Sequence, residues 1–400
     1  MPVRAKPFPP RPPRFGFEEI QGLTSALQRN ELWYWHDNSI VEAAAKSAAQ
    51  KFGSPFCVAT SSGTASLHVA IAAARLSPGT EVITTPITDA GTINAILYQN
   101  LIPVFADVDP DSCVPTVDQI AAVMTERTGA VVVVHLTGSP VDLDPIVAMC
   151  AERGLTLIED CAQGLGATYR GKSIGTFGRF GCYSLNDQKH ITSGEGGFVI
   201  MQQESDYFLC HNYADKYYDR HKQGVRLDAL APNYRMSELD GAMFTAQMNR
   251  LDSIVERRSA SGAYLDAEFA KIPGLIPQRR TPDTRSVFFF YLLRIDSAII
   301  KCSRDEFLAQ LEAEGIPARG AYVTAPIYRS PYFLKRSFFP GGIWPAQIVS
   351  GEDYDYSLIN LPGAEVAVAT GISLVLHEGF ERADLDDYVA AFDLVASRNR

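Results

Sequence analysis

The strongest constraint on the fold of this chain is an alternation of short β-branched runs with helical segments, which extends from about residue 17 to residue 250. Strands that alternate with helices are joined by right-handed crossovers and form a mainly parallel sheet. One of these runs, Ala130–His135, is almost continuously apolar, which is typical of a strand covered on both faces. We therefore predict an α/β fold with helices on both faces of a mainly parallel sheet. The predicted strands are Glu81–Pro86, Ile102–Ala106, Ala130–His135 and Leu155–Ile158, and the predicted helices are Ser66–Arg75, Thr116–Thr125 and Asp144–Arg153.

The pattern changes after a long predicted helix at Ser237–Ser259. The apolar run Ser286–Ile295 predicts a strand, and the capping box Ser303–Glu306 predicts the start of a helix that ends near Glu314. A last amphipathic helix is expected at Asp384–Ala396. These elements predict a smaller α+β domain that follows the large one.

Residues 1–16 are basic and rich in proline, and they lack the apolar segment of a secretory signal. We expect an extended arm that is either disordered or lies on a neighbouring subunit. A chain of 400 residues is long for one core, so two domains are expected after the arm. The predicted division is the arm at 1–16, a large domain at 17–255 and a small C-terminal domain at 256–400.

The composition argues against several classes of protein. The formal net charge is −10, whereas a protein that binds duplex nucleic acid needs a basic surface to neutralise phosphates. No apolar run is long enough to cross a bilayer, so no membrane partner is predicted. The seven cysteines form no C-x-x-C pair and the seven histidines form no H-x-x-x-H pair, so no metal site is predicted. Unpaired cysteines favour a cytoplasmic location.

Polar residues follow two of the strand-like segments, at the edge where open α/β sheets bind ligands. Ser61–Ser66 opens a helix, and small residues there either bind a phosphate or serve as an ordinary N-cap. Asp160 and Gln163 follow the strand Leu155–Ile158. An acid in this position is either a structural cap or a catalytic group. In a pyridoxal-phosphate site it would pair with the pyridine nitrogen, and Gln163 could donate to the ring oxygen.

Lys189 is the candidate nucleophile. Most isolated lysines are solvated surface charges, but Ser184 lies five residues before Lys189, and a glycine turn at Gly194–Gly197 and a strand at Phe198–Ile200 follow it. A lysine held in an apolar pocket has a lowered pKa, which suits Schiff-base chemistry. His190, the next residue, is interpreted as a packing residue.

Eight motifs occur in an order that resembles the DegT/DnrJ/EryC1/StrS family of pyridoxal-phosphate (PLP) sugar aminotransferases. The resemblance covers about residues 17–390 and implies the type I fold of the aspartate aminotransferase superfamily, with residues 17–255 as the PLP-binding domain. The motifs are Ser62–Thr64, Thr85–Thr88, Pro103–Asp109, Val134–Leu136, Ile158–Gln163, Tyr183–Lys189, Gly194–Gly197 and Asn233–Leu239.

The resemblance implies a role for each matching residue. Lys189 would carry the cofactor as a Schiff base and shuttle a proton, Asp160 would hold the pyridine nitrogen, and Gln163 would hold the ring oxygen. Asn233 would reach the phosphate of the partner subunit's cofactor, so the family resemblance implies a homodimer with shared active sites. The residues expected to bind the phosphate within one subunit are Gly63, Thr64 and Ser184.

Asp89 departs from the family pattern, because relatives often have an aromatic residue here that stacks on the cofactor ring. Either another side chain covers that face, or Asp89 contacts the substrate or the ring differently. The substrate wall is expected from loop residues with apolar faces and polar tips, which suit a hydroxylated ring but are equally compatible with ordinary packing. The candidates are Trp35, His36, Tyr217 and Tyr322.

The resemblance implies that an amino group moves from glutamate or glutamine to a ketone of a sugar, a nucleotide-linked sugar or a cyclitol. One branch of the family has histidine in place of the lysine and dehydrates sugars, whereas here His190 follows Lys189 without replacing it. Dehydration, or other PLP chemistry on the same scaffold, remains the first alternative. A DNA-binding regulator with the same fold is the second, and it would need a helix-turn-helix and a basic face.

Overall fold

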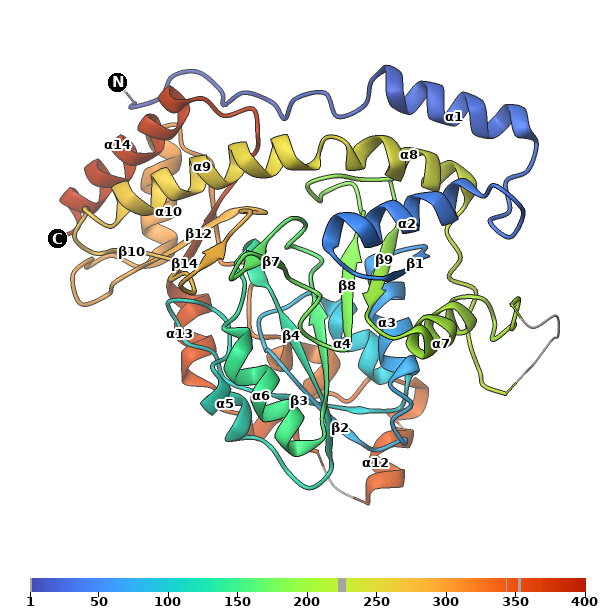
Figure 1. Ribbon diagram of the computed structural model, residues 1–400. Helices are drawn as coiled ribbons and strands as arrows, with labels where there is room; N and C mark the ends of the chain where they lie inside the picture. The colour runs from blue at the N-terminus through green and yellow to red at the C-terminus, as the bar shows by residue number, and fades with distance from the viewer. Residues whose placement is uncertain (1, 222–227, 343, 352–353) are drawn as a thin grey trace.

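The computed structural model describes residues 2–221, 228–342, 344–351 and 354–400. At its centre lies a seven-stranded sheet with the order β1-β9-β8-β5-β4-β2-β3 (Figure 1). The strands from β3 to β8 pair in parallel, whereas β9 is antiparallel to both of its neighbours. The predicted mainly parallel α/β fold is therefore confirmed. The strands are β1 (Phe56–Thr60), β2 (Glu81–Thr84), β3 (Ile102–Phe105), β4 (Thr128–Val134), β5 (Thr156–Asp160), β8 (Phe180–Ser184) and β9 (Gly197–Met201).

The central sheet separates two apolar cores, because successive side chains of a strand point to opposite faces. In β4, Val131 and Val133 belong to one core, and Ala130 and Val132 belong to the other. All four are almost completely buried. The helices α2 (Ile40–Phe52), α5 (Val117–Ala121), α6 (Leu143–Arg153) and α8 (Glu238–Met248) contribute to the first core, α3 (Gly63–Ala73) and α7 (Glu204–Ala214) to the second, and α4 (Ala90–Tyr98) to both.

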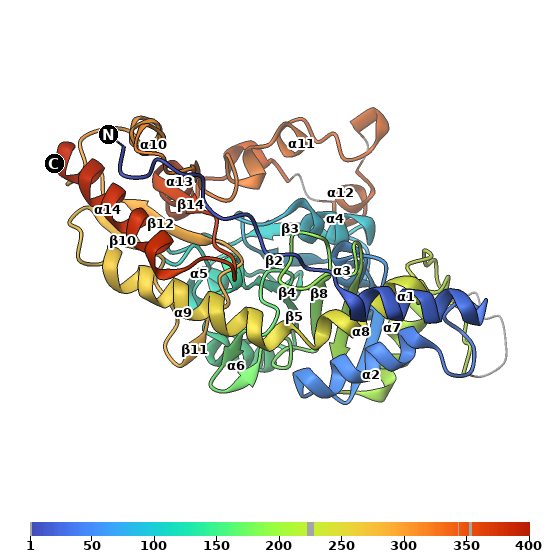
Figure 2. The ribbon, with the colours of Figure 1, turned by 90° about the horizontal axis from the view of Figure 1, so that it is seen from above.

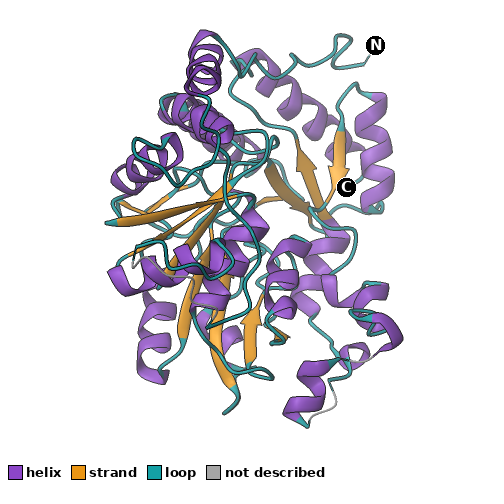
Figure 3. Ribbon diagram, turned by 90° about the vertical axis from the view of Figure 1, so that its right-hand side faces the viewer, coloured by secondary structure: helices purple, strands orange, loops and turns teal. Residues whose placement is uncertain are grey.

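A second, antiparallel sheet of four strands forms in the C-terminal part of the chain, with the order β10-β12-β14-β13 (Figure 3). It packs with α9, α10 and α14 around a third apolar core. The predicted capping box is confirmed, because Ser303 accepts from the amide of Glu306 and the Glu306 carboxylate accepts from the amide of Ser303. These elements are β10 (Leu275–Pro277), β12 (Tyr291–Ile295), β13 (Ala318–Gly320), β14 (Gly371–Leu374), α9 (Leu251–Phe269), α10 (Arg304–Ala313) and α14 (Arg382–Arg398).

The segment between β13 and β14 packs on the first core rather than on the third, through residues such as Tyr328, Phe333 and Trp344. The predicted boundary between residues 255 and 256 lies inside α9, and we propose that this helix connects the two domains. The elements of the segment are α11 (Pro331–Leu334), α12 (Pro345–Ser350) and α13 (Pro362–Thr370), and a small third sheet is formed by β6 (Thr168–Tyr169), β7 (Lys172–Ser173) and β11 (Thr284–Arg285).

Three sequence-based predictions of secondary structure were wrong in part. The helix expected at Thr116–Thr125 ends at Ala121. The single helix expected at Ser237–Ser259 is two helices, because the amides of Asn249 and Arg250 bond to carbonyls three residues back and tighten the chain between α8 and α9. The strand expected at Ser286–Ile295 begins only at residue 291. The preceding residues instead bond to the loop after β4, where Phe289 donates to the carbonyl of Thr137 over 2.7 Å.

The N-terminal arm is neither disordered nor turned away from its own subunit. It runs along the C-terminal helix α14 and then across the molecule to α1 (Phe17–Arg29), which packs on α8 (Figures 1 and 2). The arm is held by Arg4, which forms ion pairs with Asp384 and Asp387, and by Phe8, whose ring stacks on Tyr388 at 4.5 Å. In the part of the chain that the structure describes, no helix is both long enough and apolar enough to cross a membrane.

Gly262 provides a test of the packing of α9 on the segment that precedes β12. A Cβ atom there would lie 2.4 Å from the buried ring of Phe288. We expect Gly262→Ala to lower the free energy of unfolding by about 1–3 kcal/mol through overpacking. Helix propensity alone would raise the free energy of unfolding, because it favours alanine over glycine by about 1 kcal/mol. Chemical denaturation of the variant shows whether overpacking or helix propensity is the larger effect. A variant more stable than the wild type would contradict the close contact between Gly262 and Phe288.

Candidate active site

Eight of the residues singled out in the sequence lie together in one cavity of about 290 Å³ at the carboxyl edge of the central sheet. They meet there because β1, β2, β5 and β8 all point toward this edge, so the loops that follow these strands converge. The residues that share the cavity are Gly63, Thr64, Asp89, Asp160, Gln163, Ser184, Lys189 and Tyr322.

One end of the cavity is formed by the start of α3. Ser62 caps this helix by accepting from the amide of Ala65 over 3.0 Å, which leaves the first amides of the helix facing the cavity. A Cβ atom on Gly63 would lie only 2.6 Å from the Cβ of Ser184, so glycine permits the close approach of α3 to the end of β8. Backbone amides, two hydroxyl side chains and a helix N-terminus together fit a phosphate group.

Asp160 is the buried acid of the cavity, with 4% of its surface exposed. One carboxylate oxygen accepts from the hydroxyl of Thr92 at 2.8 Å, and the other accepts from the amide of Ala162 at 3.0 Å. Because Thr92 gives its proton to Asp160, the 2.8 Å contact between the hydroxyls of Thr88 and Thr92 must have Thr88 as its donor. Burial raises the pKa of Asp160 above its usual value.

Thr92 was not predicted as a site residue. The spacing of four residues between Thr88 and Thr92 is the signal that could have found it, since it places the two side chains on one side of a helical turn.

The orientation of Gln163 is fixed by the loop after β4. Its side-chain oxygen accepts from the amide of Thr137 at 2.7 Å, so the amide group of the side chain keeps its two N–H donors for other partners. Thr137 has a φ of 63°, a left-handed conformation that is uncommon for a residue with a side chain. This backbone turn aims its N–H at Gln163, and the side-chain donors of Gln163 are then available to an acceptor in the cavity.

Lys189 lies on the loop between β8 and β9, and its ammonium group is 4.4 Å from the centre of the Phe289 ring. Burial lowers the pKa of Lys189, and the nearby carboxylates of Asp160 and Asp89 partly offset this effect. A lysine with a lowered pKa is more often neutral and nucleophilic. His190 is completely buried and its ring bonds to the carbonyl of Val287, in line with the predicted packing role.

Asp89 and Tyr322 lie at the rim of the cavity. The Asp89 carboxylate caps α4 by accepting from the amide of Gly91 at 2.8 Å, and its surface is exposed. Burial and the nearby charge of Asp89 raise the pKa of the Tyr322 phenol, and its ring stacks on Phe290 with a centroid distance of 5.4 Å. Tyr322 therefore brings an aromatic ring from the C-terminal part of the chain next to the position where Asp89 stands.

A larger cavity of about 780 Å³ adjoins the first and shares Asp89, Lys189 and Tyr322 with it. The N-terminal arm supplies one wall, which includes Arg11, and Arg319 lines the side contributed by β13. More cationic than acidic side chains line this cavity, so it favours ligands with an anionic group.

Four other predicted residues lie elsewhere: among the described residues of one subunit, they line neither cavity. Trp35 packs edge-on against a histidine of α7 at 5.2 Å, and the buried Tyr217 accepts a hydrogen bond from Arg75 at 3.0 Å. His36 lies 3.6 Å from a buried carboxylate of α8. Asn233 is exposed on the surface. Tyr322 is thus the one candidate substrate residue that the fold of a single subunit brings to the site.

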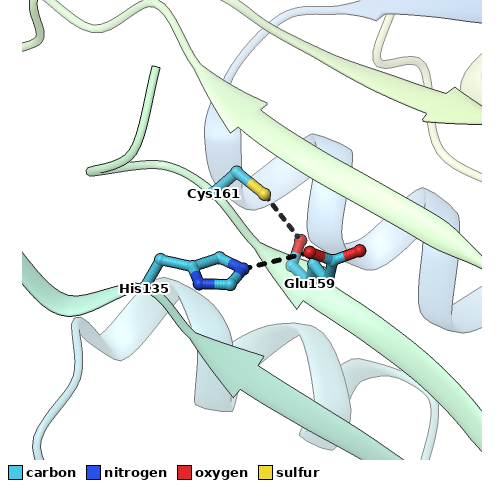
Figure 4. Close-up of side chains that lie close together, drawn as sticks. All are labelled: His135, Glu159 and Cys161. Carbon is cyan, nitrogen blue, oxygen red and sulfur yellow. Dashed lines mark hydrogen bonds and ion pairs between the residues drawn. The ribbon is translucent and has the colours of Figure 1, made fainter. Parts of the chain in front are cut away.

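A buried cluster of His135, Glu159 and Cys161 lies beside Asp160, and no sequence pattern predicted that these three side chains would meet (Figure 4). The Glu159 carboxylate accepts from three backbone amides between residues 175 and 178 and contacts Nε2 of His135 at 3.1 Å. Because Nδ1 of His135 accepts from the amide of Val141, the ring proton lies on Nε2 and is donated to Glu159. These bonds occupy the donor and acceptor atoms that a metal ion would need, so we interpret the cluster as structural support for β4 and β5.

The sequence model of the DegT/DnrJ/EryC1/StrS aminotransferase family matches residues 15–392. The chain belongs to this family. It is therefore an aminotransferase that depends on PLP, in agreement with the prediction from its motifs.

Individual relatives support this assignment over nearly the whole chain. A Micromonospora echinospora protein, provisionally named L-glutamine:3-amino-2,3-dideoxy-scyllo-inosose aminotransferase, is 31% identical over 98% of this chain and 94% of its own length. An aminotransferase from Psychrobacter cryohalolentis superposes with a TM-score of 0.85 at 27% identity, covering 98% of this chain and all of that one. The structure of DesI with its TDP-sugar product superposes with a TM-score of 0.80 at 27% identity, covering 95% of this chain and 90% of that one.

The cluster around Glu159 can be tested as a structural element. Glu159→Gln replaces an acceptor of four hydrogen bonds by a group that also carries donors, so we expect the free energy of unfolding to fall by about 2–4 kcal/mol. Calorimetry or chemical denaturation measures the loss. Glu195→Gln, on the exposed turn before β9, is the control and should have little effect. A fall in the melting temperature of the wild-type protein on adding a chelator would contradict the structural interpretation and indicate a bound metal.

Proposed function

We propose that this aminotransferase moves an amino group from glutamate or glutamine to a ketone of a sugar, a nucleotide-linked sugar or a cyclitol, with Lys189 as the cofactor-bearing lysine. The observation that carries the assignment is that Lys189, Asp160 and the N-terminus of α3 line one cavity. A primary amine, an acid and a phosphate site are the three groups that hold PLP in an aminotransferase.

Each residue then has a distinct task. When bound, PLP supplies an electron sink and carries the amino group between donor and acceptor. Asp160, oriented by Thr92, would hold a proton on the pyridine nitrogen, and Gln163 would donate to the ring oxygen. Lys189 would move a proton between the substrate carbon and the cofactor. The phosphate would be held by Gly63, Thr64 and Ser184.

The substrate class is proposed from the relatives and the larger cavity. One relative is named for an amino cyclitol ketone, and a solved neighbour was crystallised with a TDP-sugar. The cationic lining of the larger cavity is compatible with the carboxylate of an amino donor or with a phosphate group. Asp89 and Tyr322 would contact the acceptor, since they lie between the two cavities.

We also propose that the working unit is a cytoplasmic homodimer. The exposed Asn233 would reach the phosphate of the partner's cofactor, and Trp35 and His36 would contribute to the substrate wall only through the dimer. Tyr217 is buried in the core of its own subunit, so we no longer assign it to the substrate wall. The described cysteines have free thiols, which is typical of a reducing compartment.

The main alternative is other PLP chemistry on the same scaffold, such as dehydration of a sugar. The two differ in the fate of the amino donor, because only transamination converts glutamate to 2-oxoglutarate, or glutamine to its keto acid. The intact Lys189 favours transamination, since it provides the group that moves the proton.

The absorption spectrum of the purified protein with PLP tests the proposed function directly. We expect a yellow band from the lysine-bound cofactor, and we expect glutamate or glutamine to bleach it with release of the keto acid. Lys189→Ala should remove the band and abolish turnover. Lys172→Ala, at an exposed position on β7, is the control and should retain both. Normal turnover in Lys189→Ala would overturn the assignment.

The pH dependence of cofactor loading tests the environment of Lys189. Only the neutral amine forms a Schiff base, so the loading rate should rise with pH, with a midpoint below the usual lysine pKa because burial lowers it. The Asp89 carboxylate raises the pKa of Lys189. Asp89→Asn removes this charge but keeps a good N-cap residue, so its midpoint should lie at lower pH. Stopped-flow absorbance measures the loading rate against pH for the wild type and for Asp89→Asn. The exposed Asp252→Asn is the control, and its midpoint should equal that of the wild type. An unchanged midpoint in Asp89→Asn would contradict the electrostatic coupling.

A further inference from the structure

The N-terminal arm contains the sequence Arg11-Pro-Pro-Arg14, whose spacing has a structural consequence. Two consecutive prolines favour the polyproline II conformation, which has three residues per turn. Residues three apart then lie on the same face of the extended chain. Arg11 and Arg14 should therefore present their guanidinium groups in the same direction, and the intervening prolines keep this arrangement stiff.

Both guanidinium groups point at the backbone of the Lys189 loop. Arg11 donates to the carbonyl of Lys189 at 2.7 Å, and Arg14 donates to the same carbonyl at 2.7 Å. Each also reaches the carbonyl of His190 at 3.4 Å, and Arg14 donates to the carbonyl of Asp187. Two cations from the arm thus converge on the loop that carries the reactive lysine.

This loop needs such donors because it lies outside the ladders of the central sheet. β8 ends at residue 184 and β9 begins at residue 197, so the carbonyls of Asp187, Lys189 and His190 point away from any strand partner. Carbonyls without a strand partner need another donor, and charged donors give the stronger bonds. The bonds to the carbonyls of Lys189 and His190 are partly buried, and the side chain of Arg14 has only 9% of its surface exposed.

The arm is held firmly enough to act as a support. Gln247 on α8 donates to the carbonyl of Arg14 at 2.7 Å and contacts the amide of Thr192 at the far end of the same loop. The guanidinium of Arg11 lies 3.5 Å from Glu378, and the ring of His377 contacts the carbonyl of Pro9. The arm is therefore fixed on both sides of the arginine pair.

We propose that Arg11 and Arg14 are positioning residues for Lys189: the arm fixes the backbone of the lysine loop, and so the direction in which the lysine amine enters the cavity. The proposal rests on Lys189 being the cofactor-bearing lysine. Small displacements of a reacting group cost much of the rate, so an arm that determines the backbone position of Lys189 contributes to turnover through the lysine. Arg11 also lines the larger cavity, whereas Arg14 is not among its lining residues.

The first test uses the protein without cofactor, so that it does not depend on the reaction. Hydrogen–deuterium exchange of a peptide that covers residues 185–193 should be about tenfold faster in Arg11→Gln/Arg14→Gln than in the wild type, because the loop opens more often. Arg4→Gln is the matched control: Arg4 belongs to the same arm but pairs with α14 and does not touch the loop. In this control the exchange of the loop should not change.

The second test separates positioning from general stability. With PLP bound, the double variant should lose about tenfold to a hundredfold in kcat of the half-reaction with glutamate or glutamine. KM for the donor is compared in the single variant Arg14→Gln, where it should change little, because Arg11 lines the larger cavity and Arg14 is not among its lining residues. Arg14→Lys, which keeps the charge but offers no planar pair of donors, should recover only part of the kcat that Arg14→Gln loses. If the double variant fails to fold, Arg14→Gln replaces it and should show the same loss of kcat to a smaller extent.

The outcomes distinguish this proposal from the proposed function. Unchanged exchange in the 185–193 peptide and unchanged kcat in a folded variant would overturn the positioning role, even if transamination is observed. Faster exchange of that peptide in a protein that shows no transamination would refute the proposed function and leave the support of the loop by the arm intact. Equal effects from Arg4→Gln would show that the arm acts only through overall stability, and this would also overturn the proposal.

Discussion

The burial of two opposite charges in one small cavity is the constraint on which the rest of this site depends. Removal from water raises the pKa of Asp160 and lowers the pKa of Lys189, so each group is shifted toward its neutral form. Under the proposed function, this cavity must keep the Lys189 amine reactive and leave Asp160 able to pair with a cationic cofactor ring. The convergence of strand ends at one edge of the sheet provides the position, and the surrounding hydrogen bonds provide the orientation.

That orientation comes from hydrogen bonds that neighbouring residues make to Asp160 and Gln163. Thr88 and Thr92 form a chain of hydroxyl donors that ends on Asp160, and the left-handed Thr137 sets the amide of Gln163. Next to them, the buried carboxylate of Glu159 joins β5 to the turn before β8. Hydrogen-bonding neighbours of this kind limit the motion of the side chains they contact, and this preorganises the site.

The sequence predicted the parts of the structure that depend on local pattern. Ser303 and Glu306 identified a helix start because a capping box needs only neighbouring residues, and Asp160 was found because it directly follows an apolar strand. Segments whose partners are distant in sequence were predicted less well. The run from Ser286 to Phe290 has strand-like composition, but contacts with the loop after β4 decide its conformation. The contacts of the N-terminal arm were not predicted either, because its basic, proline-rich composition does not indicate which carbonyls it binds.

By itself, the sequence determined the order of strands and helices, the edge of the sheet at which polar residues gather, and the family with its lysine and aspartate. These follow from hydrophobic period, turn residues and motif order, which are properties of neighbouring positions. Only the tertiary structure decided that Thr92 orients Asp160, that Tyr322 stands beside Asp89, and that Arg11 and Arg14 hold the Lys189 loop. Each of these contacts joins residues from different elements, and most join segments far apart in the chain. Their formation depends on how the elements pack against one another, which no local pattern encodes.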